Sequence, residues 1–487
     1  MKAKKIKPMP LPTEDQFFGL EENLQRELFR SMCSAIRALE QRLDKVEASL
    51  HQDSSNSSKP PSSDGYAKPA PSSLRKKSGR KPGAQKGHRG MGYSLPKDPD
   101  EVIACMPGNC QGCPFHDRCQ STARISQRRY VSDVEVKVRV TEFDQMEVFC
   151  PFHRETFFGA FPQGVTGPVQ YGQNLSAIAS LLFLHGVVSY ERIHDILKSL
   201  TDLPLSRGWV FGKVKALAKS ADLSETLEKI RCLLLKTKVV NVDETGLRVN
   251  GRLAWCHSVS NSRYTYQTIS PKRGFVGMTA GGFLNVYPGI IVHDFFRSYW
   301  KFTQLAGHGT CGTHLMREMK GIGETWENQE WSIEMLALFS SMNDFRNKAI
   351  ENGQRRFYQP TIDMFTTQYN EILLKAREEN PIPTEQVPVP GRKKSMPLIT
   401  RLAEHQDEVL LFLNDFDIPF TNNQAERDIR PVKVRMKVSG CFRKWEGSED
   451  YLRLRSYVST AVKHGVGTFK AICLALSGQS GQVLVTA

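Results

Sequence analysis

The first regular pattern of hydrophobic positions lies within residues 14–50. Its apolar residues are spaced alternately three and four apart: Phe29, Met32, Ile36, Leu39, Leu43, Val46 and Leu50. This spacing keeps one apolar seam along a helix, so the segment is predicted to form a helix that pairs as a short coiled coil. The alternative is an amphipathic helix docked on its own protein.

Two further patterns follow before residue 222. Valines at 134, 136, 138 and 140 alternate with charged residues, which predicts a half-buried strand. The spacing then becomes helical. Three helices are expected, at Gln173–Phe183, at Ser189–Leu200 and from a cap at Ser206 to Lys219. Short helices with a tight turn between them favour a helix-turn-helix, although any small helical domain gives the same pattern.

From Lys236 the pattern indicates strands. The expected elements are strands at Val239–Asp243, Leu253–Val259 and Tyr264–Ile269, a helical segment at Gly274–Gly282 and a strand at Gly289–Asp294. Three antiparallel strands, a helix and another apolar strand describe a ribonuclease H-like sheet, in which the first and fourth strands are neighbours. Asp243 and Asp294 are therefore expected side by side. Paired carboxylates without a basic partner favour a divalent metal ion.

Composition and charge narrow the class of protein. The 487 residues, 40% of them hydrophobic, allow two to four domains and exclude global disorder. The best apolar stretch, Ala177–Val188, is too short to span a membrane, and the basic N-terminus leads into prolines rather than a signal peptide. These two observations predict an intracellular, cytoplasmic protein, and the net charge of +15 predicts a polyanionic partner.

More than half of that charge lies in a segment that cannot form a core. Residues 51–92 are rich in Ser, Pro, Gly and Lys, and the part from 59 to 89 holds nine basic residues against one acid. A solvated linker is one interpretation. The charge density favours a flexible arm that contacts DNA phosphates. The arm residues expected to bind DNA are Arg75, Lys76, Lys77, Arg80 and Lys81.

Four of the eleven cysteines lie between residues 105 and 119, and the others are scattered, as reduced thiols in packed positions would be. Cys110 with Cys113, and Cys150 with His153, have the spacing of two zinc knuckles. They predict a structural Zn²⁺ site, because four protein ligands leave no position open for chemistry. The competing ligands are Cys105, His116 and Cys119.

A third candidate carboxylate, Glu426, opens a basic run. The cations that follow it are Arg427, Arg430, Lys433, Arg435, Lys437, Arg443 and Lys444. Asn423 with Glu426 has capping-box spacing, so Glu426 could merely cap a helix. A cap needs none of those charges, whereas metal-dependent chemistry on DNA needs a carboxylate among phosphate-binding cations.

Together these motifs resemble the insertion sequence 66 family of bacterial transposases. The segments that carry the resemblance are Asn56–Asp64, Val242–Thr245, His293–Tyr299, Cys311–Glu318, Asn422–Arg427 and Lys437–Arg443. The resemblance implies that Asp243, Asp294 and Glu426 are a catalytic triad that holds two Mg²⁺ (or Mn²⁺) ions. It also implies a leucine-zipper-like first helix and a zinc-binding domain, in which His153 stands where the family has a cysteine.

Some residues beside these motifs have less clear roles. Glu244 neighbours Asp243 but points to the opposite face of a strand, so it is left out of the triad. His314 and Arg317 lie one helical turn apart and could both face the site. Cys311 with His314 could form a second metal knuckle, and a packed helix is favoured instead.

The predicted architecture is multidomain α/β. Its parts are a coiled-coil helix (1–52), a disordered basic linker (53–100), a zinc-binding domain (101–165), a helical, helix-turn-helix-like DNA-binding domain (166–230) and a ribonuclease H-like catalytic domain (231–480) with a largely helical insertion at about 303–416. The expected function is cleavage of insertion-sequence ends and transfer of the 3′-OH strands into target DNA, at the bacterial nucleoid. The expected partners are terminal inverted repeats, target DNA, further copies of the chain and accessory proteins of the same element. The alternative is a zinc-containing DNA-binding regulator with an inactive nuclease-like core.

Overall fold

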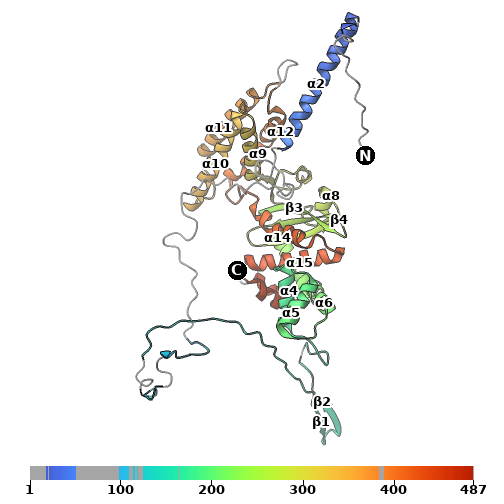
Figure 1. Cartoon of the computed structure of the whole chain (residues 1–487), viewed down its shortest axis with the longest axis vertical. Helices are drawn as coiled ribbons and strands as arrows, with labels where there is room; N and C mark the ends of the chain where they lie inside the picture. The colour runs from blue at the N-terminus through green and yellow to red at the C-terminus, as the bar shows by residue number, and fades with distance from the viewer. Residues whose placement is uncertain are drawn as a thin grey trace. The chain divides into compact units, whose positions relative to one another are not determined.

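The computed structural model describes residues 18–19, 21–50, 98–108, 113–115, 118, 124–162, 164–382 and 389–485 (Figure 1). The chain divides into two units. One unit takes residues 73–171 and 190–209, and the other takes residues 1–72, 172–189 and 210–487. No helix among the described residues is long and apolar enough to cross a membrane.

The N-terminal helix α2 spans Glu22–Leu50. It covers most of the range predicted from the apolar seam, and residues 14–17 of that range lie outside the described residues. Phe29, Ile36 and Leu39 of the seam are 61%, 53% and 55% exposed. Pairing with a second helix stays a prediction.

The described part of the smaller unit contains a short hairpin and helix α5. Strands β1 (Glu147–Cys150) and β2 (Glu155–Phe158) pair antiparallel, and helix α5 spans Tyr190–Thr201. The strand predicted at residues 134–140 is wrong: the chain there has no strand pairing, and Val134 and Val140 are 84% and 86% exposed. Alternation shows only which side chains would share a face. A strand also needs a partner strand, which the pattern cannot supply.

Three more helices precede the sheet. They are α4 (Gln173–Leu184), α6 (Arg207–Ala218) and α7 (Ala221–Leu235). The predicted cap of α6 is confirmed, because the Ser206 hydroxyl oxygen accepts the Trp209 N–H at 3.1 Å. Helix α7 was not predicted; it is capped by Ser220 and buries Leu223, Leu227, Ile230 and Leu234.

The larger unit is built on a five-stranded mixed sheet. Its elements are β3 (Val239–Val249), β4 (Arg252–Ser260), β5 (Thr265–Ser270), α8 (Phe275–Ala280), β6 (Ile290–His293), the 3₁₀ turn η3 (Tyr299–Lys301) and β7 (Gly307–Thr310). The strand order is β5-β4-β3-β6-β7, with β3, β4 and β5 antiparallel and with β6 parallel to both β3 and β7. The predicted pairing of the first strand with the fourth is confirmed.

Strand β3 is longer than its apolar run predicts. It continues to Val249, so Asp243 lies inside a strand and not at its end. The hairpin to β4 turns at Asn250 and Gly251, whose φ angles are +48° and +73°. An Asn-Gly pair suits such a turn because both residues tolerate positive φ.

The stretch from 303 to 416 is largely helical, as predicted. Its helices are α9 (Gly312–Thr325), α10 (Glu330–Glu351), α11 (Gln359–Glu378), α12 (Arg392–Glu404) and α13 (Gln406–Asn414). The predicted boundary is too early, because β7 lies inside it and pairs with β6. The Gly-His-Gly-Thr sequence of β7 has only one β-branched residue and two glycines, so it carries little signal of a strand. The helices share a core that contains Trp331, Phe339 and Tyr369.

The helical insertion begins and ends at one point. The backbone N–H of Gly312, at the start of α9, donates to the carbonyl oxygen of Phe420 at 2.8 Å. A Cβ atom on Gly312 would lie 2.3 Å from the ring of Phe420. Glycine is therefore required for this close approach.

After the insertion, helices return to the sheet. They are α14 (Asn423–Ser439), α15 (Trp445–Lys463), α16 (Thr468–Leu476) and the 3₁₀ turn η4 (Ser480–Leu484). Helix α14 contacts β3 and β4, and α15 contacts β5 (Figure 1). Strand β5 is an edge strand, and the N–H groups of Thr265 and Gln267 donate to hydroxyl oxygens of α15 at 3.0 and 2.9 Å. The helix thus satisfies donors that a bare edge would expose.

Candidate active site

Two acidic residues meet where the parallel strands β3 and β6 end their pairing. Val239 pairs with Ile290 and Asn241 with Val292. Continuing this register by two residues brings Asp243 level with Asp294, which follows directly after β6.

The chain turns sharply after Asp294. The Asp294 carboxylate accepts the Phe296 N–H at 3.1 Å, and the intervening Phe295 has a φ of +71°. Positive φ is rare for a bulky residue and costs on the order of 1–3 kcal/mol. Such strain clusters at functional sites, and here it lies beside a candidate metal ligand.

A third carboxylate reaches the same place from α14. Asn422, which precedes the helix, donates its side-chain amide to the Val242 carbonyl oxygen at 2.7 Å and accepts from the Asn241 amide at 2.9 Å. Both asparagines are buried, 1% and 5% exposed. These bonds fix the first turn of α14, which contains Glu426, against β3 beside Asp243.

The capping-box interpretation of Glu426 is wrong. Helix α14 begins at Asn423 without a side-chain cap, and Glu426 is its fourth residue. In a capping box Glu426 would be the third residue of the helix and would bond back to the cap. The Glu426 carboxylate therefore does not cap the start of α14.

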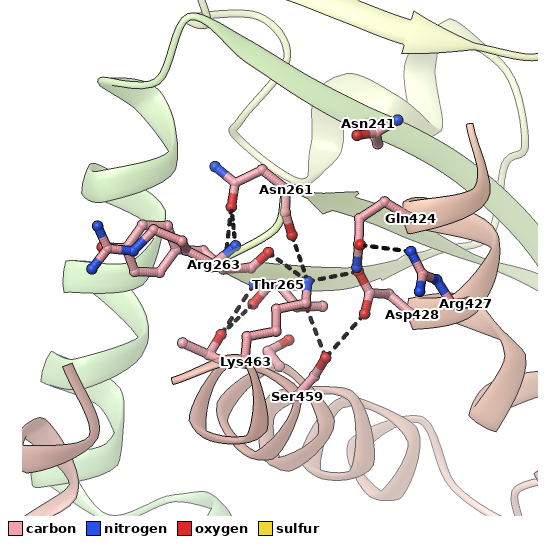
Figure 2. Close-up of polar contacts among 12 residues, drawn as sticks. Asn241, Asn261, Arg263, Thr265, Gln424, Arg427, Asp428, Ser459 and Lys463 are labelled. Carbon is pink, nitrogen blue, oxygen red and sulfur yellow. Dashed lines mark hydrogen bonds and ion pairs between the residues drawn. The ribbon is translucent and has the colours of Figure 1, made fainter. Parts of the chain in front are cut away.

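A buried ion pair holds α14 from its other side (Figure 2). Lys463 of α15 donates to the Asp428 carboxylate at 2.7 Å, and Asp428 also accepts from Gln424 at 2.9 Å and from Ser459 at 3.1 Å. The side chains of Lys463 and Asp428 are only 10% and 7% exposed. Burial lowers the pKa of Lys463, and the Asp428 charge opposes this shift. Because Asp428 lies two residues after Glu426, it faces nearly the opposite side of the helix.

The electrostatics of the cluster favour a bound cation. Burial, followed by the charges of Glu244, Asp294 and Glu426, raises the pKa of Asp243 to about 8, while Lys433 acts in the opposite direction. Burial and Asp294 also raise the pKa of Glu244 to about 7. Oxygen donors that repel one another in this way suit a hard divalent cation, which would neutralise them.

Glu244 is anchored by residues that the sequence did not single out. Its carboxylate accepts the Tyr299 hydroxyl at 2.6 Å and the Arg273 Nε–H at 3.0 Å. The Arg273 guanidinium also lies 4.1 Å from the ring centroid of Phe296. These contacts join β3 to the turn after Asp294, and no sequence spacing signals them.

Cys311 and His314 come together with Glu426. Cys311 is 1% exposed and precedes α9, and its sulfur accepts the Asn422 N–H at 3.2 Å. The Nδ1 atom of His314 lies 3.9 Å from Glu426 Oε1. Burial alone would lower the pKa of His314, but the neighbouring Cys311 side chain and the charges of Asp294 and Glu426 raise it to about 9. The segment forms a helix, as the favoured interpretation predicted, yet it also gathers three potential ligands.

Comparison with known families assigns the chain. Residues 168–450, more than half of the sequence, match the Transposase IS66 family. The chain belongs to this family. The transposase also matches a family of unknown function (DUF6444) over residues 9–93. No curated protein matches it significantly. Membership confirms the family that the sequence motifs suggested, and it implies DNA as the substrate.

The basic residues that follow Glu426 in the transposase differ in their exposure to solvent. Arg427, Arg430, Lys437, Arg443 and Lys444 are exposed, and Lys433 is half-buried. The predicted DNA contact by Arg435 is wrong. Arg435 is 7% exposed, donates to the Phe183 carbonyl oxygen at 3.1 Å and lies 4.3 Å from the Phe183 ring centroid. On a helix, residue 435 points away from the face of 430, 433 and 437, and so into the protein.

The zinc and arm residues are only partly described. Cys150 and His153 lie together at the β1–β2 hairpin, with 3.2 Å between Sγ and Nδ1. Cys113 is also described, whereas Cys110 lies outside the described residues. The expected arm contacts Arg75, Lys76, Lys77, Arg80 and Lys81 lie outside them too. The zinc site therefore stays a prediction.

Proposed function

We propose that this transposase cleaves the ends of its insertion sequence and transfers the freed 3′-OH strands into target DNA. Asp243, Asp294 and Glu426 form its catalytic triad. The observation that carries the proposal is the convergence of these carboxylates from β3, the end of β6 and the first turn of α14. The strand order and directions are those expected of a ribonuclease H-like domain.

The donor set fits divalent metal ions. The carboxylates are close enough to raise the pKa of Asp243 by their mutual repulsion, and oxygen ligands are what Mg²⁺ and Mn²⁺ prefer. Two bound ions would activate the attacking oxygen and stabilise the leaving one. The protein itself positions the ligands, through the amide bonds of Asn241 and Asn422 and through the ion pair below α14.

Helix α14 also provides a path for DNA. Glu426, Arg430, Lys433 and Lys437 are spaced four, three and four residues apart, so they share one stripe of the helix. The stripe is about 16 Å long at the α-helical rise per residue. Cations on it would bind successive phosphates and lead a strand to Glu426. Arg427 and Arg443 add exposed charge nearby in the sequence.

The remaining segments complete the proposal. The region 101–165 binds a structural Zn²⁺ through Cys110, Cys113, Cys150 and His153, and the basic arm supplies salt-sensitive affinity for DNA. The seam of α2 pairs two or more copies of the chain at the bacterial nucleoid, where the substrate lies. Accessory proteins of the same element are further partners.

The test is cleavage of DNA that contains the sequences flanking the gene. Asp243→Asn, Asp294→Asn and Glu426→Gln should each lower Mg²⁺-dependent cleavage by more than roughly 100-fold, because even outer-shell changes at metal sites reach that size. Binding of the ends should persist. Glu327→Gln, which removes an exposed carboxylate, is the matched control.

Three other outcomes would change the proposal. Mg²⁺-dependent cleavage by any of the three variants would remove that residue from the triad. Binding of the ends by the wild-type protein without any cleavage would favour the regulator with an inactive core. A pre-cleaved end that never joins target DNA would instead indicate a nuclease without strand transfer.

A further inference from the structure

We propose that Cys311, His314 and Glu426 bind a zinc-class transition-metal ion at the edge of the carboxylate cluster. The inference rests on the proposed function in one respect, because Glu426 would be a ligand in both metal sites. It concerns a second chemical class of metal, because thiolate and imidazole are ligands of Zn²⁺ and not of Mg²⁺.

The geometry brings one donor atom from each residue into the same small volume. The cysteine sulfur, an imidazole nitrogen and a carboxylate oxygen all lie within 4.8 Å of one another. In a tetrahedral zinc site such donors are about 3.5 Å apart, given bond lengths of 2.0–2.3 Å. Side-chain shifts of about 1 Å would close the site around an ion.

The two helices that supply the donors are held together at this point. Cys311 ends the link from β7 and His314 lies in the first turn of α9, so the pair has knuckle spacing on a helix start. Glu426 comes from the first turn of α14, and the Asn422 N–H before that helix donates to the Cys311 sulfur. The sulfur thus already accepts a hydrogen bond, as a metal-bound thiolate does.

A polar atom in the cluster lacks a partner. Among the described residues, His314 Nδ1 is buried and makes no hydrogen bond, and its 3.9 Å distance to Glu426 is too long for one. An unsatisfied buried polar atom costs about 1–3 kcal/mol. A simple His–Glu ion pair would close this distance. A metal ion between the two side chains accounts for both the separation and the missing partner.

Three protein ligands leave one position open. Zinc sites of this kind hold a water or substrate atom in the fourth position, whereas structural sites use four protein ligands. The open position here would lie beside the proposed catalytic carboxylates, because Glu426 is one of them. The substrate class expected at that position is a phosphate oxygen of DNA.

The test is the zinc content of the purified full-length protein, measured by mass spectrometry of the metal after dialysis against metal-free buffer. Cys311→Ser and His314→Gln should each carry about one zinc ion fewer per chain than the wild type, in line with loss of a three-ligand site. Cys441→Ser changes an exposed cysteine and should keep the wild-type content. The predicted zinc knuckles are unchanged in all of these proteins, so any zinc they bind contributes equally to each.

Folding and the proposed function are checked separately. Circular dichroism and thermal melting show whether each variant is folded. If the Cys311→Ser variant, which changes a buried residue, is not folded, the zinc content of the His314→Gln variant tests the inference. Folded His314→Gln protein with wild-type zinc content would overturn the inference and leave the proposed function intact. Asp294→Asn tests cleavage without removing a zinc ligand, so it should lose cleavage and keep its zinc.

Discussion

The buried ion pair between Asp428 and Lys463 gives the sharpest test of how α14 is held. Asp428→Asn keeps the shape of the side chain and removes its charge. The lysine then keeps three oxygen acceptors, at 2.6–3.0 Å, but loses the charge of its ion-pair partner Asp428 (Figure 2). We expect this single change to destabilise the larger unit more than any exposed Asp→Asn substitution.

The magnitude follows from the geometry. Opposite charges 2.7 Å apart attract by about 6 kcal/mol at an effective dielectric constant of 20, and desolvation of both groups offsets part of that. Removal of one member of a buried pair typically costs about 3–5 kcal/mol. Because Lys463 keeps three acceptors, the expected loss in free energy of unfolding is about 3 kcal/mol, at the low end of that range. This is a large share of the total stability of a typical protein, about 5–15 kcal/mol.

The assay is urea denaturation followed by circular dichroism, with Asp407→Asn as the exposed control. Lys463→Met alone leaves the Asp428 charge buried and should also be costly. The double variant Asp428→Asn with Lys463→Met should lose less than the sum of the single losses, by about 2 kcal/mol, because no buried charge is then left unpaired. A loss below about 1 kcal/mol in Asp428→Asn, or strict additivity, would refute this account.

Three further predictions follow from other contacts. Burial lowers the pKa of His308 to about 4, so its stabilising effect is present above pH 6.5 and is lost as the pH falls through 4. His308→Gln should reduce the change in the free energy of unfolding between pH 6.5 and pH 4 by up to about 3 kcal/mol. An unchanged pH dependence of that free energy would contradict this. Gly312→Ala should lower the thermal midpoint and cost about 1–3 kcal/mol, because its new methyl group meets the buried ring of Phe420, and an unshifted midpoint would count against it. Arg430→Gln should weaken DNA binding and reduce its salt dependence at unchanged stability, whereas Arg435→Met should mainly reduce stability; equal effects on binding would contradict the assignment of the two faces.

Much of the catalytic region was predictable from local sequence. Apolar β-branched runs marked β3 and β6, and the order of strands and helix between them predicted their adjacency, which brought Asp243 level with Asp294. The placement of Glu426 was predictable only through its motif. The contacts that fix it, from Asn422 to Val242, join residues 180 positions apart and leave no periodic signal.

Other predictions failed for identifiable physical reasons. The cations after Glu426 were all predicted to bind DNA, but the helix turns Arg435 to the opposite side, where aromatic rings and a carbonyl group surround it. The valines at 134–140 alternate as a strand does, yet no partner strand pairs with them among the described residues. The sequence could not choose between a packed helix and a ligand pair at Cys311, because the third donor comes from a distant helix.

The closure between Gly312 and Phe420 has a consequence for how such proteins can vary. The chain leaves the sheet and returns to it through two backbone groups 2.8 Å apart. Helix α13 also contacts β7, and His405, between α12 and α13, lies with its ring centroid 5.5 Å from that of Phe295. Helices α10 and α11 mainly contact other helices of the insertion, so they can lengthen or shorten with little effect on the distance from Asp294 to Glu426. Helices α10 and α11 can thus diversify toward different DNA or protein surfaces, whereas α12 and α13 are constrained by their contacts with β7 and with Phe295, next to Asp294.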